Sequence, residues 1–230
     1  MLLGGNMDLK FKQSNIGCYK VVEFDNRKFV MDLSTLKSKS YYWGLLPKTV
    51  SLKLSEIDKN NNKFEINNRK VSLSTTVIAI IVQPFVKIGY DLLKSFFINY
   101  DLSSQIIIKT VLFFVSIVIS YLIVAQSLFR AHAKSKMFLD KNFNHYQITF
   151  NTSKKRNPVN LIVLIGNLIC FCVYMYVNNG TEGAILVINC VWSIVLFLSS
   201  WTMPPISHSY QNQFLTFEGI EKVIKIKESR

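Results

Sequence analysis

The stretch from Ile106 to Phe129, IIIKTVLFFVSIVISYLIVAQSLF, is predominantly apolar and long enough to cross a lipid bilayer as a helix. The apolar layer of a bilayer is about 30 Å thick and requires about 20 mostly apolar helical residues. A segment exposed to lipid must also satisfy its own backbone hydrogen bonds, and a helix does so. Two further apolar runs follow, at residues 161–177 and 184–201. The sequence therefore predicts an integral membrane protein.

Positive charge is distributed unevenly along the chain. The 230 residues include 27 Lys and Arg, and the formal net charge is +13. Thirteen of these cations lie in residues 1–70, seven between Arg130 and Arg156, and four from Lys222 onward. Cytoplasmic segments of membrane proteins are enriched in Lys and Arg, so these three regions are predicted to be cytoplasmic. Segments 99–105 and 178–183 contain no Lys or Arg and are predicted to lie outside.

The fold class predicted from this pattern is an α-helical polytopic membrane bundle with a small cytoplasmic β-rich region. The bundle occupies residues 71–201, with spans at about 72–98, 106–129, 160–177 and 184–201 and a basic cytoplasmic loop at 130–158. The β-rich region occupies residues 1–70 and is joined by a strand-like basic tail at 202–230. Four spans place both ends in the cytoplasm, and a fifth, re-entrant crossing is the alternative. The expected location is a bacterial cytoplasmic membrane.

The first span is the one that the sequence leaves open. If residues up to about 98 are helical, Thr76, Gln83, Lys87, Asp91 and Lys94 fall within an arc of about 80°. Charges of opposite sign three or four residues apart on a helix can pair. The charged part of this stripe, which begins at Lys87, follows Pro84. The stripe either forms a partner-binding or pore-lining face, or places its charges at the outer headgroups. The segment is read as a kinked span, as a short span continued by an interfacial helix, or as a re-entrant hairpin.

The remaining spans carry milder polar stripes, which helix packing explains. Small and polar residues allow membrane helices to approach closely and to form hydrogen bonds across the contact. The predicted helix-packing residues are Ser116, Ser120, Asn167 and Asn189.

Strand-like segments flank the predicted membrane region. The runs 19–24 and 28–33 are separated by Asp25-Asn26-Arg27, which predicts a β-hairpin. A second hairpin is predicted from Thr49–Ile57 and Lys63–Val71, and the tail from Phe214 to Lys227 also alternates like a strand. The predicted β-rich region is near the lower size limit for an independent core.

Signals for catalysis, metal binding or nucleic-acid binding are weak. The four cysteines are scattered, and His132, His145 and His208 share no ligand spacing, so no metal site is predicted. The sequence contains no phosphate-binding glycine loop and no nucleophile elbow, which predicts neither an enzyme nor a cofactor. The basic loop 130–158 is explained by topology and by attraction to anionic lipid rather than by nucleic acid. Gly4-Gly5 ahead of a second methionine suggests Met7 as the translation start.

The layout of the whole chain resembles a known family. A basic N-terminal β region containing Tyr41-Tyr42-Trp43-Gly44-Leu45-Leu46-Pro47-Lys48, paired spans, a Lys-rich central loop and a strand-like basic tail resembles the tandem five-transmembrane proteins of Gram-positive bacteria. Some members of that family act as immunity proteins against a membrane-depolarising toxin exported by type VII secretion. The chain departs from the family in having four predicted spans, and the family defines no catalytic residues to transfer.

The resemblance implies a non-enzymatic immunity protein that binds and neutralises a membrane-inserting toxin within the bilayer. The expected contact is the stripe on the first helix, Gln83, Lys87, Asp91 and Lys94. The alternative is a small transporter, channel subunit or membrane accessory protein in which the same stripe lines a pathway. The oligomeric state stays open, and a homo-oligomer is compatible with the sequence.

Overall fold

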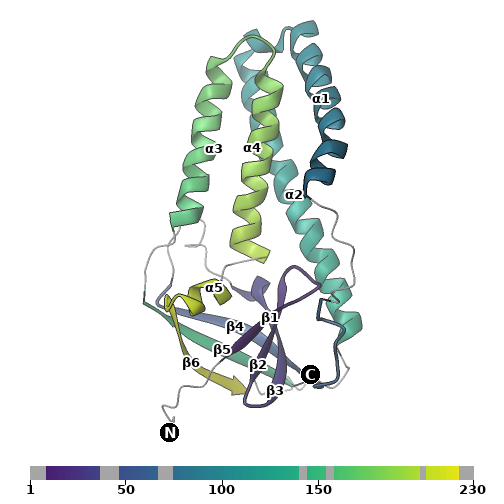
Figure 1. Cartoon of the computed structure of the whole chain (residues 1–230). Coiled ribbons are helices and arrows are strands. Elements are labelled where there is room, and N and C mark those ends of the chain that lie inside the picture. The colour runs from purple at the N-terminus through teal and green to yellow at the C-terminus, as the bar shows by residue number, and fades with distance from the viewer. Residues whose placement is uncertain are drawn as a thin grey trace, which may run out of the picture. The chain divides into compact units, whose positions relative to one another are not determined.

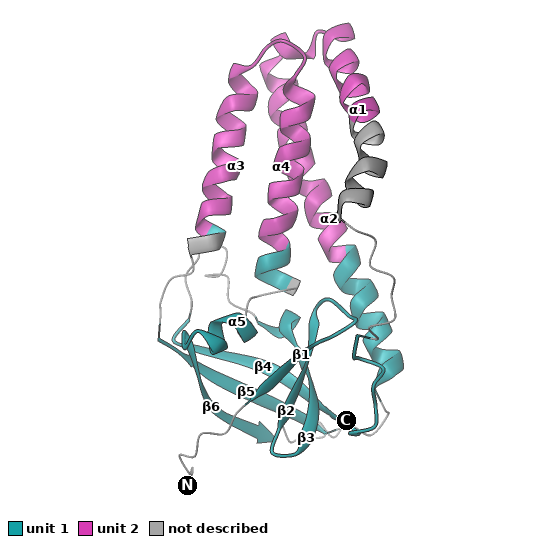
Figure 2. Ribbon diagram, viewed as in Figure 1, with its two compact units in different colours: residues 1–67, 126–160, 198–230 teal, residues 68–125, 161–197 magenta. Residues whose placement is uncertain are grey.

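The computed structural model of the chain describes residues 9–36, 47–66, 75–139, 144–153, 158–202 and 206–222. The chain divides into two compact units (Figure 2). Unit 1 comprises residues 1–67, 126–160 and 198–230, and unit 2 comprises residues 68–125 and 161–197. The predictions for Met7, for residues 41–46 and for parts of the strand 63–71, the span 72–98 and the tail strand 214–227 lie outside the described residues.

Unit 1 is built on a six-stranded antiparallel sheet whose strand order follows the chain order (Figure 1). Its strands are β1 (Lys10–Gln13), β2 (Tyr19–Phe24), β3 (Arg27–Asp32), β4 (Thr49–Ile57), β5 (His145–Thr152) and β6 (Leu215–Lys222). Strand β5 comes from the segment that the sequence predicts as a basic loop. The sheet is thus completed by segments that lie far from the N-terminal region in the sequence.

The hairpin predicted around Asp25-Asn26 is confirmed. Phe24 pairs with Arg27, so the connection between β2 and β3 has two residues. Asp25 and Asn26 have φ angles of 47° and 58°. Two-residue hairpin turns of the I′ type need positive φ at both positions, and Asp and Asn tolerate this conformation better than most residues.

The second predicted hairpin is wrong. The strand Thr49–Ile57 is present as β4, but it pairs with β3 on one side and with β5 on the other. Its two edges are therefore occupied, and the described part of the segment from Lys63 contributes only an isolated bridge between Glu65 and Ser14. The alternation of apolar and polar residues predicted strand β4. Its partner β5 was not predicted as a strand, because it lies in the segment predicted to be a basic loop.

Both faces of the sheet are covered by apolar side chains. Neighbouring residues of a strand point to opposite faces, so Val22 and Val21 enter two separate clusters. The first cluster includes Phe29, Ile148 and Ile206, and the last of these lies in the short helix α5 (Ile206–Gln211). The second cluster packs against the following side chains near the end of the long helix α2 (Ile106–Phe138): Leu128, Ala131, Phe138 and Leu139.

Unit 2 is helical. Its α-helices are α1 (Thr75–Asn99), α2 (Ile106–Phe138, up to residue 125), α3 (Pro158–Tyr176, from residue 161) and α4 (Glu182–Phe197). A π-helical turn, Leu198–Thr202, follows α4 and belongs to unit 1. Helix α1 runs without a break through Gly89, so the re-entrant hairpin is wrong. Aromatic contacts join these helices: the ring of Phe113 packs on Phe171, and Phe97 packs on Tyr174.

The predicted fold class requires correction. The chain is a mixed α/β structure with a six-stranded antiparallel sheet and five α-helices among the described residues, not a four- or five-span bundle. Only two described helical segments are long and apolar enough to cross a membrane by length and composition, Ile106–Phe138 and Glu182–Trp201. The apolar helix at Asn160–Tyr176 is shorter. The sequence predicted a β-rich region, but it predicted neither strand β5 nor the pairing of six strands in one sheet.

Candidate functional site

Unit 2 buries polar side chains beside the aromatic cluster of Phe97, Phe113 and Tyr174, and many of its large apolar side chains are exposed. We call the buried polar set the polar core; it consists of Lys109, Ser116, Ser120, Glu182, Asn189 and Ser193. The exposed large apolar side chains include Ile107, Phe114, Leu122, Ile162, Leu168, Val187 and Val191. Polar and ionisable groups inside an apolar helical unit are costly and are functional candidates by default.

An ion pair lies at one end of the polar core. The Lys109 Nζ is 3.6 Å from Glu182 Oε1, and the two side chains are 1% and 0% exposed. Lys109 Nζ also donates hydrogen bonds to the backbone oxygen of Val177 at 2.7 Å and to Asn178 Oδ1 at 2.9 Å. The same ammonium lies 5.3 Å from the centre of the Tyr174 ring. The charge of Lys109 is therefore compensated from several directions.

The Glu182 carboxylate is less well satisfied than its partner. Neither of its oxygens has a hydrogen-bond partner among the described residues, and neither does the buried hydroxyl of Tyr174. Glu182 begins α4, where the partial positive charge of a helix N-terminus stabilises a carboxylate. The neighbouring Gly183 permits this close packing, because a Cβ added there would lie 2.6 Å from the Cβ of Leu93 in α1.

The middle of the polar core joins α2 to α4 through side-chain hydrogen bonds. Asn189 Nδ2 donates to Ser116 Oγ at 2.8 Å, and Ser120 Oγ donates to the backbone oxygen of Cys190 at 3.0 Å. The Asn189 Oδ1 and Ser193 Oγ atoms have no hydrogen-bond partner among the described residues. Ser116, Ser120 and Asn189 thus meet, whereas the predicted packing residue Asn167 on α3 keeps a buried Oδ1 without a described partner.

The stripe predicted on the first helix lies largely on the surface of α1. Lys87 and Asp91 are exposed and Lys94 is half-buried, while the Gln83 side chain lies outside the described residues. Among the ion pairs of the described residues, none joins Lys87 to Asp91 or Asp91 to Lys94. The structure therefore does not gather these residues into one interior site.

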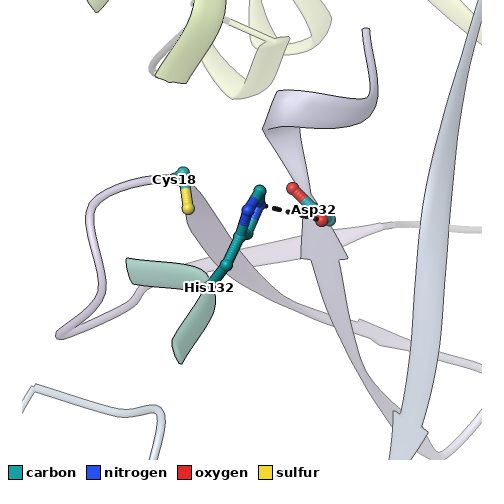
Figure 3. A group of neighbouring side chains, drawn as sticks. All are labelled: Cys18, Asp32 and His132. Carbon is teal, nitrogen blue, oxygen red and sulfur yellow. Dashed lines mark ion pairs between the residues drawn. The ribbon is translucent and has the colours of Figure 1, made fainter. Parts of the chain in front are cut away.

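Unit 1 contains a second group of side chains, shown in Figure 3. Cys18 directly precedes β2, Asp32 ends β3, and His132 lies on α2, with its ring between the other two side chains. One sulfur, one oxygen and one nitrogen atom from the three residues lie within 4.8 Å of one another. The His132 Nε2 is 3.7 Å from Asp32 Oδ2 and 2.9 Å from Ser34 Oγ.

The chemistry of this group differs from that of a cysteine nucleophile. Burial raises the pKa of the Cys18 thiol to about 12, and the nearby charge of Asp32 adds to the effect. Burial likewise raises the pKa of the Tyr19 hydroxyl, which accepts a hydrogen bond from Ser135 Oγ. A nucleophilic cysteine needs a lowered pKa. The three residues instead supply the S, N and O donors that hold a transition metal.

An open pocket of about 520 Å³ adjoins the group. Its lining includes Asp32 and His132, and the other polar side chains around it are Tyr19, Lys53, Ser55, Ser135, Lys136 and His145. The carboxylate and the imidazole can thus be reached from solvent, whereas the Cys18 side chain lies behind them and is only 2% exposed.

The chain was compared with family models, with curated proteins and with solved structures. None matches it.

Two features escaped the sequence-based prediction. Neither member of the ion pair was predicted as a site residue, although Lys109 is the one charged residue between Ile106 and Phe129 and Glu182 is the one acidic residue in the segment 178–183. A single charged residue in an otherwise uncharged segment was the sequence feature that could have indicated this pair. No sequence spacing links Cys18, Asp32 and His132, because only the β2–β3 register and the packing of α2 bring them together.

Proposed function

We propose that unit 2 resides in a lipid bilayer, with α2 and α4 crossing it, and that the protein is a non-enzymatic immunity protein. It protects the cell by binding a membrane-depolarising protein toxin within the bilayer. The observation that carries the membrane assignment is the apolar exterior of unit 2 around its polar core. The choice of a toxin as partner rests on the resemblance of the sequence layout to the tandem five-transmembrane proteins.

The exposure of the two long apolar segments supports a location in lipid. In the apolar 18-residue stretch of Ile106–Phe138 only 22% is buried, and in that of Glu182–Trp201 only 28% is buried. The core helix of a soluble protein is mostly buried, and an apolar surface of this extent is costly in water. Lipid removes this cost.

The exposed charges of α1 offer a binding face for a toxin helix. Lys87 and Asp91 are exposed beside the exposed apolar residues Ile88 and Leu92. A helix that inserts into the bilayer with polar groups on one side gains by pairing them with these charges, because interhelical hydrogen bonds and close packing drive association in lipid. Such pairing removes the toxin helix from a conducting assembly.

Anionic lipid is the second proposed partner. Arg130, Lys134 and Lys136 are exposed on the part of α2 that follows its apolar segment. A cation near an acidic membrane surface contributes about 1 kcal/mol of attraction. These three side chains would hold the end of α2 at the cytoplasmic headgroups.

The test is a measurement of membrane potential with a voltage-sensitive dye in cells that produce a candidate toxin encoded beside the gene, with and without this protein. Restored polarisation at an unchanged toxin level supports neutralisation. The double variant Lys87→Leu/Asp91→Leu is expected to lose protection while its membrane level is unchanged. Leu168→Ala/Ile169→Ala, on exposed positions of α3, is the matched control and should protect fully. Protection by both variants alike would remove the α1 face from the proposal.

A small channel or transport subunit is the second candidate, and the buried Lys109–Glu182 pair favours it, because ionisable groups inside membrane helices often line a pathway. Ion or solute flux into liposomes that contain the purified protein and no toxin distinguishes the two functions. Flux through the wild-type protein that is lost in Glu182→Gln would favour a channel or transport function. Absence of flux, together with protection of cells from the toxin, would favour immunity.

A further inference from the structure

The β2–β3 hairpin and helix α2 bring three potential metal ligands together within unit 1. Tyr19 pairs with Asp32 in the hairpin, and the backbone N–H of Leu33 donates to the Cys18 oxygen at 2.9 Å. Cys18 and Asp32 are therefore neighbours across the strand ends. Helix α2 packs on the same face of the sheet through Leu128 and Ala131, which places His132 beside them (Figure 3).

We propose that Cys18, Asp32 and His132 bind a zinc ion through Sγ, a carboxylate oxygen and a ring nitrogen, and that a water molecule from the adjoining pocket completes the coordination.

The donor set selects the metal. Zinc takes thiolate, imidazole and carboxylate ligands at about 2.0–2.3 Å in a tetrahedron, which separates neighbouring ligand atoms by about 3.5 Å. The distance of 3.7 Å between Asp32 Oδ2 and His132 Nε2 is close to that value. All three ligand atoms, the Cys18 sulfur included, lie within 4.8 Å of one another. The side chains therefore need to move only slightly closer together to bind zinc. Calcium and magnesium prefer all-oxygen sites, so the thiol disfavours them.

Hydrogen bonds outside the three ligands already orient the carboxylate. Asp32 Oδ1 accepts from the backbone N–H of Ser34 at 3.0 Å and from the Ser34 hydroxyl at 2.6 Å, while Oδ2 is the oxygen nearer to His132. Partners of this kind around a metal ligand fix its orientation and raise metal affinity. Since the single Ser34 proton is donated to Asp32, the His132 Nε2–H donates to Ser34 Oγ. A metal at Nε2 takes the place of that proton, which then sits on Nδ1.

The pocket supplies the route of entry and the fourth position. Asp32 and His132 line it, whereas Cys18 lies behind them. Three protein ligands with one side open to water are the arrangement in which zinc keeps a bound water. Binding also releases a proton, because zinc coordinates the thiolate form of cysteine and an ordinary cysteine thiol is mostly protonated near neutral pH. Affinity should therefore rise with pH.

The experiment uses the full-length protein in detergent micelles or nanodiscs, with any purification tag removed, and titrates it with Co²⁺ as a spectroscopic substitute for zinc. One equivalent of Co²⁺ should give a thiolate-to-cobalt charge-transfer band and the visible bands of a tetrahedral site, and Zn²⁺ should abolish both. Cys18→Ser should lose the charge-transfer band, and His132→Gln and Asp32→Asn should weaken binding at least tenfold. Asparagine is also a good N-cap, so Asp32→Asn retains the turn that follows β3.

Matched variants separate this site from adventitious binding. Cys172→Ser, His208→Gln and Asp58→Asn change the same residue types elsewhere in the chain and should bind Co²⁺ like the wild type. Zinc X-ray absorption of the wild-type protein gives a second measurement, which does not depend on the folding of any variant: one sulfur and otherwise nitrogen or oxygen neighbours are expected. A charge-transfer band that persists in Cys18→Ser, or a zinc shell without sulfur, would overturn the proposal.

Discussion

The Nζ of Lys109 on α2 lies 3.6 Å from Oε1 of Glu182 at the start of α4, with both side chains almost fully buried. This pair connects two helical segments that are distant in the sequence. Because the Glu182 oxygens have no hydrogen-bond partner among the described residues, Lys109 is the principal compensation for the carboxylate charge.

Removal of one member of this pair should destabilise unit 2 strongly. Lys109→Met leaves the buried Glu182 carboxylate without its cation, which costs about 3–5 kcal/mol. Glu182→Leu should cost less, because the Lys109 ammonium keeps its hydrogen bonds to Val177 and Asn178. The double variant should be more stable than either single variant, since it buries no charge. Thermal unfolding in detergent measures the three effects. The control is Lys134→Met, which changes an exposed lysine of α2. Single variants as stable as this control would show that the Lys109–Glu182 pair does not stabilise the fold.

Two glycines of unit 2 should respond oppositely to alanine. At Gly183 an added Cβ would lie 2.6 Å from the Cβ of Leu93, so Gly183→Ala forces α1 and α4 apart and should cost about 1–3 kcal/mol. At Gly89 no atom lies within 4 Å of an added Cβ, so Gly89→Ala should be neutral or stabilise α1 by up to about 1 kcal/mol. Unfolding temperatures compare the two variants directly, and equal values would contradict the close approach.

Acid should loosen the loop that follows β4. The buried Lys28 ammonium donates to the backbone oxygens of Lys59 and Asn61 and lies 2.8 Å from Glu65 Oε1. The hydrogen bond and charge of Lys28 hold the pKa of Glu65 below its usual 4.5. A lowered folded-state pKa stabilises the fold above the unfolded-state pKa, and this stability is lost as pH falls through the folded value.

Hydrogen exchange of residues 58–66, corrected for the intrinsic effect of pH, measures this loosening. Protection should be constant near neutral pH and should fall below about pH 4.5 in the wild type. Glu65→Gln should have lower protection near neutral pH and should lose most of the acid-dependent change. Glu218→Gln, an exposed glutamate of β6, should behave like the wild type. An identical pH profile in Glu65→Gln would assign the acid response to other groups.

The accessibility of Cys172 tests the lipid location of unit 2. This cysteine is exposed on α3. In intact membranes an apolar maleimide should label it, whereas a charged maleimide should not, because lipid excludes the charged reagent. Dissolving the membrane in detergent should allow both reagents to react. Mass spectrometry locates the label, and Lys134→Cys provides a site expected to react with both reagents in inside-out vesicles. Fast labelling of Cys172 by the charged reagent in intact membranes would contradict the location.

Local patterns predicted the elements better than their arrangement. The hairpin at Asp25-Asn26 and the strand Thr49–Ile57 follow from turn chemistry and alternation, and both are present. Strand β5 shows the same alternation through Tyr146, Ile148 and Phe150, but the surrounding Lys and Arg led to its prediction as a loop. Its partners β4 and β6 lie far away in the sequence, so no local pattern specifies that pairing.

The interior sites were harder to predict, because they depend on contacts between distant segments. The serine and asparagine stripes pointed to packing, and Ser116 does meet Asn189. The pairing of Lys109 with Glu182 requires knowledge of how α2 and α4 are aligned. Cys18 and His132 come together only when the hairpin has formed and α2 has packed on it. They are too far apart in the sequence for a motif of fixed spacing to link them.

The order of the strands constrains biosynthesis. Strands β4 and β5 are neighbours in the sheet, yet α1 and α2 are synthesised between Ile57 and His145, and α3 and α4 are synthesised before β6. The first four strands therefore leave the ribosome long before β5, the second partner of β4, is made, and the unpaired edge of β4 is a hazard for aggregation. Helices α1 and α2 are made before β5 can add to the sheet, and α3 and α4 are made before β6 can add to it. A complete sheet therefore forms only after all four helices have been synthesised.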